Sequence, residues 1–273
     1  MIRGLNWFGF ETEYANLMCT WNGDIAKHID MIEALDFNYI RLPFSLDFIV
    51  DADWVHMDEF FDLAEEKDLK VLLDFHRLEN THQSPVPYND KYSFEDFLQG
   101  WITILDRYET YSTLEAVDIF NEYQGDNYVE WNSLARQIVS FIENAFPERF
   151  RYYVGGVSWG GNLHDMDLSD LPFFDRVTYT IHKYWFSDSA PYDDKWNYSI
   201  KKPVMTGEFG YMSNEPHQVD FAYKFVDYLI KNNIRDTFFW TWSYNSGDTG
   251  GILKEDCETI DTAKMDLLHY LWL

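Results

Sequence analysis

Residues 202–211 read Lys-Pro-Val-Met-Thr-Gly-Glu-Phe-Gly-Tyr. The run from Pro203 to Gly207 predicts a short buried strand, and Glu208 follows at its C-terminal tip. A glycine stands on each side of the Glu208-Phe209 pair, which lets the backbone turn where a Cβ would clash. An α/β barrel presents a catalytic acid in this way, although a charged residue that merely ends a strand gives the same pattern. The rest of the chain has to decide between these two interpretations.

Strand-like and helix-like segments alternate along the whole chain. Apolar runs predict strands at 4–10, 37–42, 70–75, 114–120, 151–157, 176–181, 203–207 and 237–241. Helical periodicity predicts helices at 24–35, 54–66, 94–107, 127–145, 219–231 and 261–273. Alternating βα units imply parallel pairing, and eight of them close into a barrel. We therefore predict an α/β fold, a (β/α)8 TIM barrel that forms one compact domain over residues 1–273, with reduced helices after strands five and six.

The charge balance excludes several classes of partner. The chain has 47 acidic and 21 basic residues, for a net charge of −26. Such a surface repels phosphate groups, which argues against nucleic acid and anionic membranes and suits an uncharged substrate. The sequence has no run of about 18 apolar residues that could span a membrane. It begins directly with a strand and not with an apolar signal region, so we expect either an intracellular protein or one whose leader was removed.

Cysteines and aromatic residues give weaker signals. Cys19 and Cys257 are too few for a disulfide framework; one bridge is possible, and two free thiols are the favoured interpretation. Aromatic residues make up 19% of the chain, which is more than a core needs, and many fall in segments that read as loops. Exposed Trp and Tyr rings stack well on the apolar faces of sugar rings. Packing of the barrel helices is the alternative explanation for most of them.

Polar side chains gather where the predicted strands end, which is where barrel enzymes carry their active sites. These strand ends contain Arg41, Asp74, His76, Asn121, Glu122, His182, Tyr184, Glu208, Trp240 and Trp242. Taken singly, His76 or His182 fits a hydrogen-bonded structural histidine, and Arg41 fits a stabilising ion pair. All of them at one face are hard to explain in this way, so we predict an active site there.

Two of these residues, Glu122 and Glu208, are expected to face each other across the barrel mouth. Glycoside hydrolysis needs one carboxyl group protonated and another ionised. The two groups lie about 5–5.5 Å apart in retaining enzymes and about 6.5–9.5 Å apart in inverting ones. Arg41 beside Glu208 would keep that carboxylate ionised. Apolar neighbours of Glu122, Phe120 and Tyr123, would raise its pKa, as an acid catalyst requires.

A metal site is the competing chemistry for Asp74, His76 and His182. The sequence contains no His-x-His and no His-Glu-x-x-His spacing, so the ligands would have to come from separate strands. We therefore predict no metal site.

At these residues the chain resembles glycoside hydrolase family 5, most closely its bacterial-type endo-β-1,4-glucanases (cellulases). The resemblance runs nearly end to end. Its most specific blocks are the first, Gly4-Leu-Asn-Trp-Phe-Gly-Phe-Glu-Thr12, and the last, Ser246-Gly-Asp-Thr-Gly-Gly-Ile-Leu-Lys254. Further blocks are Ile40-Arg-Leu-Pro43, Leu73-Asp-Phe-His-Arg77, Asn121-Glu122, Trp159-Gly-Gly-Asn-Leu163 and Gly207-Glu-Phe-Gly210.

The resemblance implies the same barrel, a double displacement through a covalent glycosyl-enzyme, retention of configuration, and no metal or cofactor. It implies that Glu122 is the acid/base, Glu208 the nucleophile, and Asn121 a hydrogen-bond partner of the sugar 2-hydroxyl. The remaining implied roles are orientation of the carboxylates by Arg41, His76, His182 and Tyr184, stacking by Trp240, and neighbouring subsites at Trp21, Trp159 and Asn162. The implied partner is a β-glucan polysaccharide or oligosaccharide, acted on by a secreted monomer.

Three features depart from the family pattern. Tyr123 replaces the usual proline after Asn121-Glu122, and Phe120 stands where relatives often have histidine. The loop that follows Tyr184 is short, and we expect neither the secretion leader nor the binding module of close relatives. The block at 246–251 favours a cellulose-like glucan over mannan. Mixed-linkage β-glucan or β-mannan is the alternative substrate, and a carbohydrate-binding barrel without catalysis is the alternative class.

Overall fold

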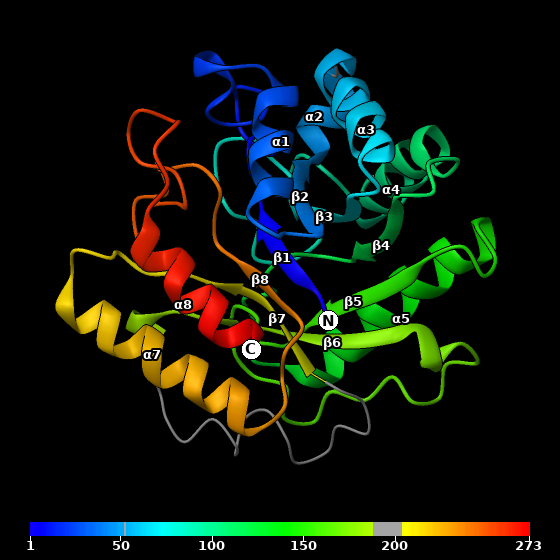
Figure 1. Ribbon diagram of the computed structural model, residues 1–273. Helices are drawn as coiled ribbons and strands as arrows, with labels where there is room; N and C mark the ends of the chain where they lie inside the picture. Colours follow the sequence, from blue (N-terminus) through cyan, green and yellow to red (C-terminus); the bar gives the residue numbers. More distant parts are fainter. Residues whose placement is uncertain (52, 188–203) are drawn as a thin grey trace.

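The strands form a closed parallel barrel in the order β1 to β8 (Figure 1). The computed structural model describes residues 1–51, 53–187 and 204–273. The strands are β1 (Arg3–Asn6), β2 (Tyr39–Ser45), β3 (Lys70–Arg77), β4 (Leu114–Asp118), β5 (Arg151–Gly155), β6 (Val177–Lys183), β7 (Val204–Phe209) and β8 (Thr237–Phe239). The barrel closes where β1 pairs with β8, with Gly4 opposite Phe238. The (β/α)8 barrel predicted from the alternation of segments is confirmed.

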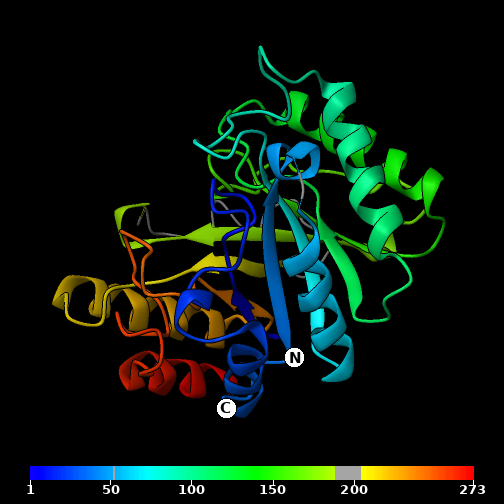
Figure 2. The same cartoon turned by 90° about the horizontal axis from the view of Figure 1, so that it is seen from above.

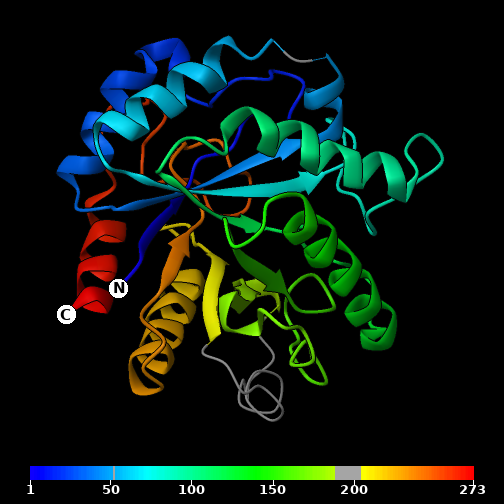
Figure 3. The same ribbon diagram turned by 90° about the vertical axis from the view of Figure 1, so that its right-hand side faces the viewer.

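Helices lie outside the ring of strands (Figures 2 and 3). They are α1 (Ile25–Ala34), α2 (Leu46–Asp51), α3 (Val55–Glu66), α4 (Phe94–Tyr108), α5 (Tyr128–Ala145), α7 (Pro216–Lys231) and α8 (Thr262–Trp272), with 3-10 turns η1 (Thr20–Asn22), η2 (Phe174–Arg176) and η3 (Trp185–Ser187). Helix α4 shows why they form: Ser93 and Asp96 make a capping box at its start, and Phe97, Trp101 and Ile104 bury one face.

The connections on either side of β6 differ from an ideal barrel. Residues 156–176, all described, contain the 3-10 turn η2 and no α-helix, as expected after strand five. After β6 the described chain contains the 3-10 turn η3. The rest of the connection in which we expected a reduced helix, residues 188–203, lies outside the described part of the chain. Among the described residues, no helix has the length and apolar character needed to cross a membrane.

Several strands extend further than the sequence predicts, which changes the setting of the polar residues. Strand β2 continues to Ser45, β6 to Lys183 and β7 to Phe209, because pairing with the neighbouring strands continues after shifts of register. His182 and Glu208 therefore belong to strands and do not follow them, which corrects the expected boundaries, whereas Arg41 lies within its strand as expected. A strand residue has less conformational freedom than a loop residue, so these side chains are held more firmly.

The interior of the barrel consists of an apolar layer below a charged one. The apolar cluster contains Tyr39, Leu72, Ala116, Tyr153, Met205 and Phe238. Two residues further along three of these strands stand Arg41, Asp74 and Asp118, all buried. Because strand side chains alternate with a period of two, these three point into the barrel above the apolar layer. The charged layer lies at the end of the barrel where the strands finish.

Cys19 and Cys257 form a disulfide, so the expectation of free thiols is wrong. The bond joins the loop after β1 to the loop after β8, across 238 residues of sequence. Closure of the barrel through β1 and β8 brings these loops together, and nothing in the local sequence reports that proximity. Asn22 donates to the carbonyl of Asp256 and ties the same two loops together. Lys27, on helix α1, forms an ion pair with Glu258 of the loop after β8 at 2.5 Å.

Candidate active site

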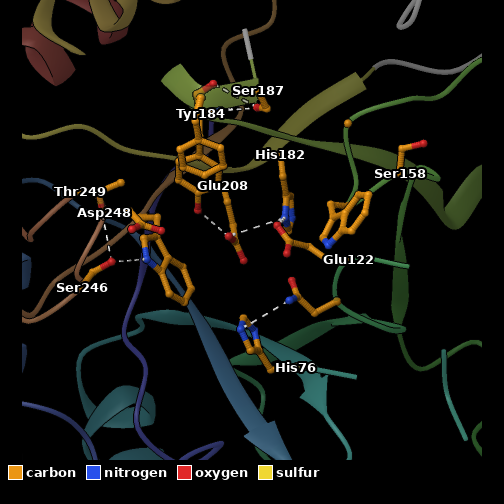
Figure 4. Close-up of a pocket in the computed structure, with 15 residues that line it drawn as sticks. His76, Glu122, Ser158, His182, Tyr184, Ser187, Glu208, Ser246, Asp248 and Thr249 are labelled. Atoms are coloured by element: carbon orange, nitrogen blue, oxygen red, sulfur yellow. Dashed lines mark hydrogen bonds and ion pairs between the residues drawn. The ribbon is translucent and has the colours of Figure 1, made fainter. Parts of the chain in front are cut away.

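A cavity of about 490 Å³ opens at the C-terminal ends of the strands (Figure 4). Most of the site residues expected from the sequence line it: His76, Asn121, Glu122, Trp159, His182, Tyr184, Glu208 and Trp240. They come from β3, β6 and β7 and from the segments that follow β4, β5, β6 and β8. Residues more than 100 positions apart in the chain therefore meet in one cavity, as expected for side chains at the C-terminal strand ends of one barrel.

Of the residues to which the resemblance assigns a role, three lie elsewhere. Arg41 is completely buried beneath the cavity. Trp21 lies on η1 with 58% of its surface exposed and lines a separate cavity. Asn162 forms an isolated antiparallel bridge with Val157, and its side chain accepts a hydrogen bond from the amide of His164.

The sequence interpretation missed other residues of this cavity and its surroundings. Phe186 lines the wall and stacks on Tyr184 with ring centroids 5.4 Å apart. Ser246, Asp248 and Thr249 also line the cavity, and the Ser246–Lys254 block quoted above was the available signal for them.

Glu208 is almost fully buried and bound on both oxygens. Arg41 Nη1 donates to Oε1 at 2.6 Å, and the Tyr184 hydroxyl donates to Oε2 at 2.6 Å. Burial alone would raise the pKa of Glu208, but the charges of His182 and Arg41 and the Tyr184 hydrogen bond outweigh it and lower that pKa. The site therefore keeps Glu208 ionised. Burial and the same carboxylate raise the pKa of Tyr184 well above its ordinary value, so its hydroxyl stays a donor.

Arg41 also binds the acids of the charged layer. Its Nε donates to Asp118 Oδ2 at 3.0 Å, and its Nη2 lies 3.0 Å from Asp74 Oδ1 and 2.9 Å from Asp118 Oδ2. Nη1 further donates to Asn6 Oδ1 at 2.9 Å. Burial raises the pKa of Asp74 to about 7 and that of Asp118 to about 6, although the guanidinium opposes both shifts. One buried cation thus faces three carboxyl groups, and Asp118 was not singled out from the sequence.

A ring of contacts fixes the amide of Asn121. Arg41 Nη2 donates to Asn121 Oδ1 at 2.9 Å, and Asn121 Nδ2 lies 3.4 Å from His76 Nε2. His76 Nδ1 lies 2.6 Å from Asp74 Oδ2, and burial lowers the pKa of His76 to about 4, so the ring is neutral. With Nδ1 protonated towards Asp74, Nε2 accepts from Asn121. Asp74 and His76 thereby determine which way the Asn121 amide faces.

Glu122 is the more exposed of the two glutamates, with 19% of its side chain accessible. The backbone of Glu122 has a φ of 49°, in the left-handed region that residues other than glycine rarely adopt. Residues in this conformation are often found at functional sites. His182 Nδ1 lies 3.0 Å from Glu122 Oε1 and 3.6 Å from Glu208 Oε2, so this imidazole stands between both carboxylates (Figure 4). Burial opposes the protonated form of His182, but the two glutamates raise its pKa overall.

The aromatic neighbours of Glu122 pack towards the helix layer. Tyr123 stacks on Trp131 of α5 at 4.9 Å, and Phe120 lies 6.1 Å from the same ring. The expected effect of Phe120 and Tyr123 on the acidity of Glu122 stays a prediction.

Trp240 is held in place from both sides and through its indole nitrogen. Its ring is nearly parallel to the rings of Phe8 and His76, each with centroids 5.6 Å away. Nε1 donates to Ser246 Oγ at 3.0 Å, and Thr249 Oγ1 donates to the same oxygen at 3.1 Å. An aromatic ring fixed in this way is a firm surface for an apolar ligand face.

Among the residues that the structure describes, two groups of side chains lie close enough to hold a metal ion: Asp74, His76 and Glu208, and Glu122, His182 and Glu208. A cation in either group would lie next to the Arg41 guanidinium, whose Nη1 is 2.6 Å from Glu208 Oε1, so charge repulsion disfavours it. The absence of a metal stays a prediction.

Comparison with known proteins identifies the family. Residues 2–246 match the family model described as Cellulase (glycosyl hydrolase family 5). The chain belongs to glycosyl hydrolase family 5. It is a glycoside hydrolase of the endoglucanase type, as the resemblance in the sequence predicted.

Individual relatives agree over nearly the full chain. An endoglucanase of Paenibacillus polymyxa is 28% identical over 97% of this chain and 81% of its own length. The major extracellular endoglucanase of Xanthomonas campestris is 26% identical over 99% of this chain and 67% of its own length. The structure of a variant of the Pyrococcus horikoshii endocellulase in complex with cellotetraose superposes with a TM-score of 0.89 at 26% identity, over 99% of this chain and 92% of that one.

Proposed function

We propose that this family 5 enzyme is a retaining endo-β-1,4-glucanase that cleaves internal bonds of cellulose-like glucans. The observation that carries the proposal is the spacing of the carboxylates: one oxygen of Glu122 and one of Glu208 lie within 4.8 Å of each other. Retaining glycosidases hold these groups about 5–5.5 Å apart, whereas inverting enzymes need about 6.5–9.5 Å for a water molecule. The complex of the Pyrococcus horikoshii relative with cellotetraose supports the choice of a β-1,4-glucan.

The two glutamates take different roles because their surroundings differ. Glu208, kept ionised by His182, Arg41 and Tyr184, attacks the anomeric carbon and forms a glycosyl ester. Glu122, more exposed to the cavity, donates its proton to the departing glycosidic oxygen and then takes a proton from the water that hydrolyses the ester. Asn121, with its amide direction fixed, donates to the 2-hydroxyl of the sugar that stacks on Trp240. Each step uses side chains of this protein and no cofactor.

We further propose that residues 1–273 act as one catalytic domain and as a secreted monomer. The Cys19–Cys257 disulfide supports an oxidising environment, where such bonds form and persist. The name of the Xanthomonas campestris relative, an extracellular endoglucanase, points to the same setting.

The test is hydrolysis of carboxymethylcellulose and barley β-glucan, with the configuration of the first product followed by NMR. The unmodified enzyme should release the β-anomer first. Glu208→Gln should lower kcat by roughly 10⁴-fold, as loss of a nucleophile does. Glu215→Gln, at an exposed position before α7, is the matched control and should keep full activity. Release of the α-anomer, or no activity of the unmodified enzyme on any β-glucan, would overturn the proposal. Faster turnover of β-mannan would transfer the same mechanism to the alternative substrate.

A further inference from the structure

Lys264 is a buried lysine that the proposed mechanism does not use. It stands in the first turn of α8 and is 2% exposed. Burial lowers the pKa of Lys264 to about 8, and the charge of Asp261 offsets this effect only in part. A cation in the first turn of a helix also opposes the helix dipole. The stability of α8 therefore gives no reason for a lysine at this position, and its contacts have to explain it.

The ammonium group of Lys264 holds the backbone of the turn that follows β8. Nζ donates to the carbonyls of Thr249 and Gly251, each at 2.8 Å. Both of these residues are buried, so their carbonyl groups need a partner within the protein. One cation on α8 therefore fixes two peptide groups of residues 246–251, which we call the 246–251 turn.

The 246–251 turn in its own right fixes the indole of Trp240. Trp240 Nε1 donates to Ser246 Oγ at 3.0 Å, and Thr249 Oγ1 donates to the same oxygen at 3.1 Å. Figure 4 shows Ser246 and Thr249 together at one side of the catalytic cavity. Thr249 thus binds Lys264 through its carbonyl and Ser246 through its hydroxyl. A short series of hydrogen bonds joins the buried cation to the ring.

The same turn packs directly against the chain that follows Glu208. A Cβ added at Gly210 would lie 3.1 Å from Cβ and Cγ2 of Thr249 and 2.1 Å from the carbonyl oxygen of Trp240. Glycine at this position permits the close approach. Because the turn contacts both Trp240 and the residues after Glu208, a shift of the turn would change how the ring is placed relative to that carboxylate.

We propose that Lys264 is a positioning residue for catalysis, which holds Trp240 in place relative to Glu208 through the 246–251 turn and does not touch the substrate. The inference rests on the proposed function for the role of Trp240 as the ring on which the sugar stacks. Lys264 lines a separate cavity and not the catalytic one. A displacement of about 1 Å in a site can lower a rate about 100-fold, so a small movement of the ring is enough to reduce kcat.

The test is a double-mutant cycle between Lys264 and Ser246 on barley β-glucan. Ser246→Ala removes the acceptor of the Trp240 indole and should lower kcat about tenfold. Lys264→Met should also lower kcat about tenfold. The double variant should lose about tenfold and not the hundredfold that independent effects would give, because both changes release the same ring. Losses that multiply to about a hundredfold, or an unchanged kcat in Lys264→Met, would overturn the proposal.

Arg149→Met is the matched control for the loss of a cation that binds backbone carbonyls. Arg149 donates to three such groups at the other end of the barrel. This variant should lower Tm and leave kcat unchanged, which separates positioning from a general loss of stability. A fall in kcat as large as that of Lys264→Met would overturn the proposal.

The NMR signal of the Trp240 indole separates this inference from the proposed function. The Nε1–H signal, assigned with Trp240→Phe, reports the hydrogen bond to Ser246 in the protein without substrate. It should shift and exchange with solvent about tenfold faster in Lys264→Met, as in Ser246→Ala, and stay unchanged in Arg149→Met. This result is expected even if the unmodified protein proves to hydrolyse no glucan. An unchanged signal in Lys264→Met would refute the positioning role and leave the proposed function intact.

A second variant covers the case in which Lys264→Met does not fold. The Lys264→Gln side chain keeps N–H donors but is one bond shorter, so it should not reach both carbonyls unless the turn moves. It should show the same shift of the Trp240 signal and the same coupling to Ser246→Ala. Lys264→Gln with an unchanged signal and full kcat would refute the inference.

Discussion

Replacing Arg41 by lysine tests whether one guanidinium both keeps Glu208 ionised and holds the site together. The side chain makes hydrogen bonds or ion pairs with Glu208, Asp74, Asp118, Asn6 and Asn121. A lysine ammonium has three donors on a shorter side chain and cannot reproduce the planar fork of five. The positive charge stays in the barrel in this variant, but its distance from Glu208 increases.

The size of the effect follows from that distance. Opposite charges about 4 Å apart attract by about 4 kcal/mol at an effective dielectric constant of about 20, and by about 3 kcal/mol at about 6 Å. The difference corresponds to a rise of about one unit in the pKa of Glu208. Because the pKa of Glu208 is lowered in the folded enzyme, activity is present above that pKa and is lost as the pH falls through it. Arg41→Lys should therefore move the acid limb of the activity profile to higher pH by about one unit.

The assay is the pH dependence of kcat/KM on carboxymethylcellulose. We expect the pH-independent kcat/KM to fall by about 100-fold as well, because Glu208 and Asn121 lose donors that hold their geometry. Arg149→Lys is the matched control. Arg149 donates to the backbone carbonyls of Glu109, Tyr111 and Leu114 at 2.7–2.8 Å, at the other end of the barrel. It should lower stability and leave the pH profile in place. An unshifted acid limb in Arg41→Lys would refute the electrostatic role.

Two further predictions concern stability. Lys264 donates to the carbonyls of Thr249 and Gly251 at 2.8 Å, and burial lowers its pKa to about 8 from an ordinary 10.5. Between pH 8 and 10.5 the unfolded chain holds a proton on Lys264 that the folded chain lacks, so the folded state gains stability as the pH rises. The free energy of unfolding in urea, relative to that of Lys264→Met, should therefore rise by up to about 3 kcal/mol across this range. A difference between the two proteins that does not change with pH would contradict this. The Cys19–Cys257 bond closes a loop across 238 residues. Its loss in the double serine variant should cost about 5 kcal/mol and lower Tm by roughly 10 °C. A reductant should lower Tm of the unmodified protein equally, and unequal values would show that the substitutions act in another way.

The alternation of segments was sufficient to predict the barrel because it is a local property. Short apolar runs and helical periods can be read within about 15 residues, and parallel closure follows from their number. The same argument predicted that Glu122, His182 and Glu208 meet, since all follow or end strands of one barrel. Strand boundaries were less accurate, because pairing at Ser45 and Phe209 depends on the neighbouring strand and not on local composition.

Other features depend on contacts between distant parts of the chain. Asp118 reads as one more acid in a strand, and its role in the charged layer appears only when β2 and β4 bring it within 3.0 Å of Arg41. The Cys19–Cys257 pair could not be recognised without closure of the barrel. Trp21 was expected to line a neighbouring sugar subsite, and the loop after β1 places it at a cavity of its own, so that role stays a prediction.

The sequence by itself determined the barrel and the family and predicted the two catalytic glutamates, because strand periodicity and short motifs are written in consecutive residues. Only the tertiary structure decided the spacing of the carboxylates, the network around Arg41 and the contacts that join Lys264 to Trp240. These are distances between segments far apart in the chain, and they are fixed when all eight strands close around one core. Glu208 illustrates the contributions of sequence and fold. The sequence marks it as an acid near a strand end, and the fold supplies the charges that keep it ionised.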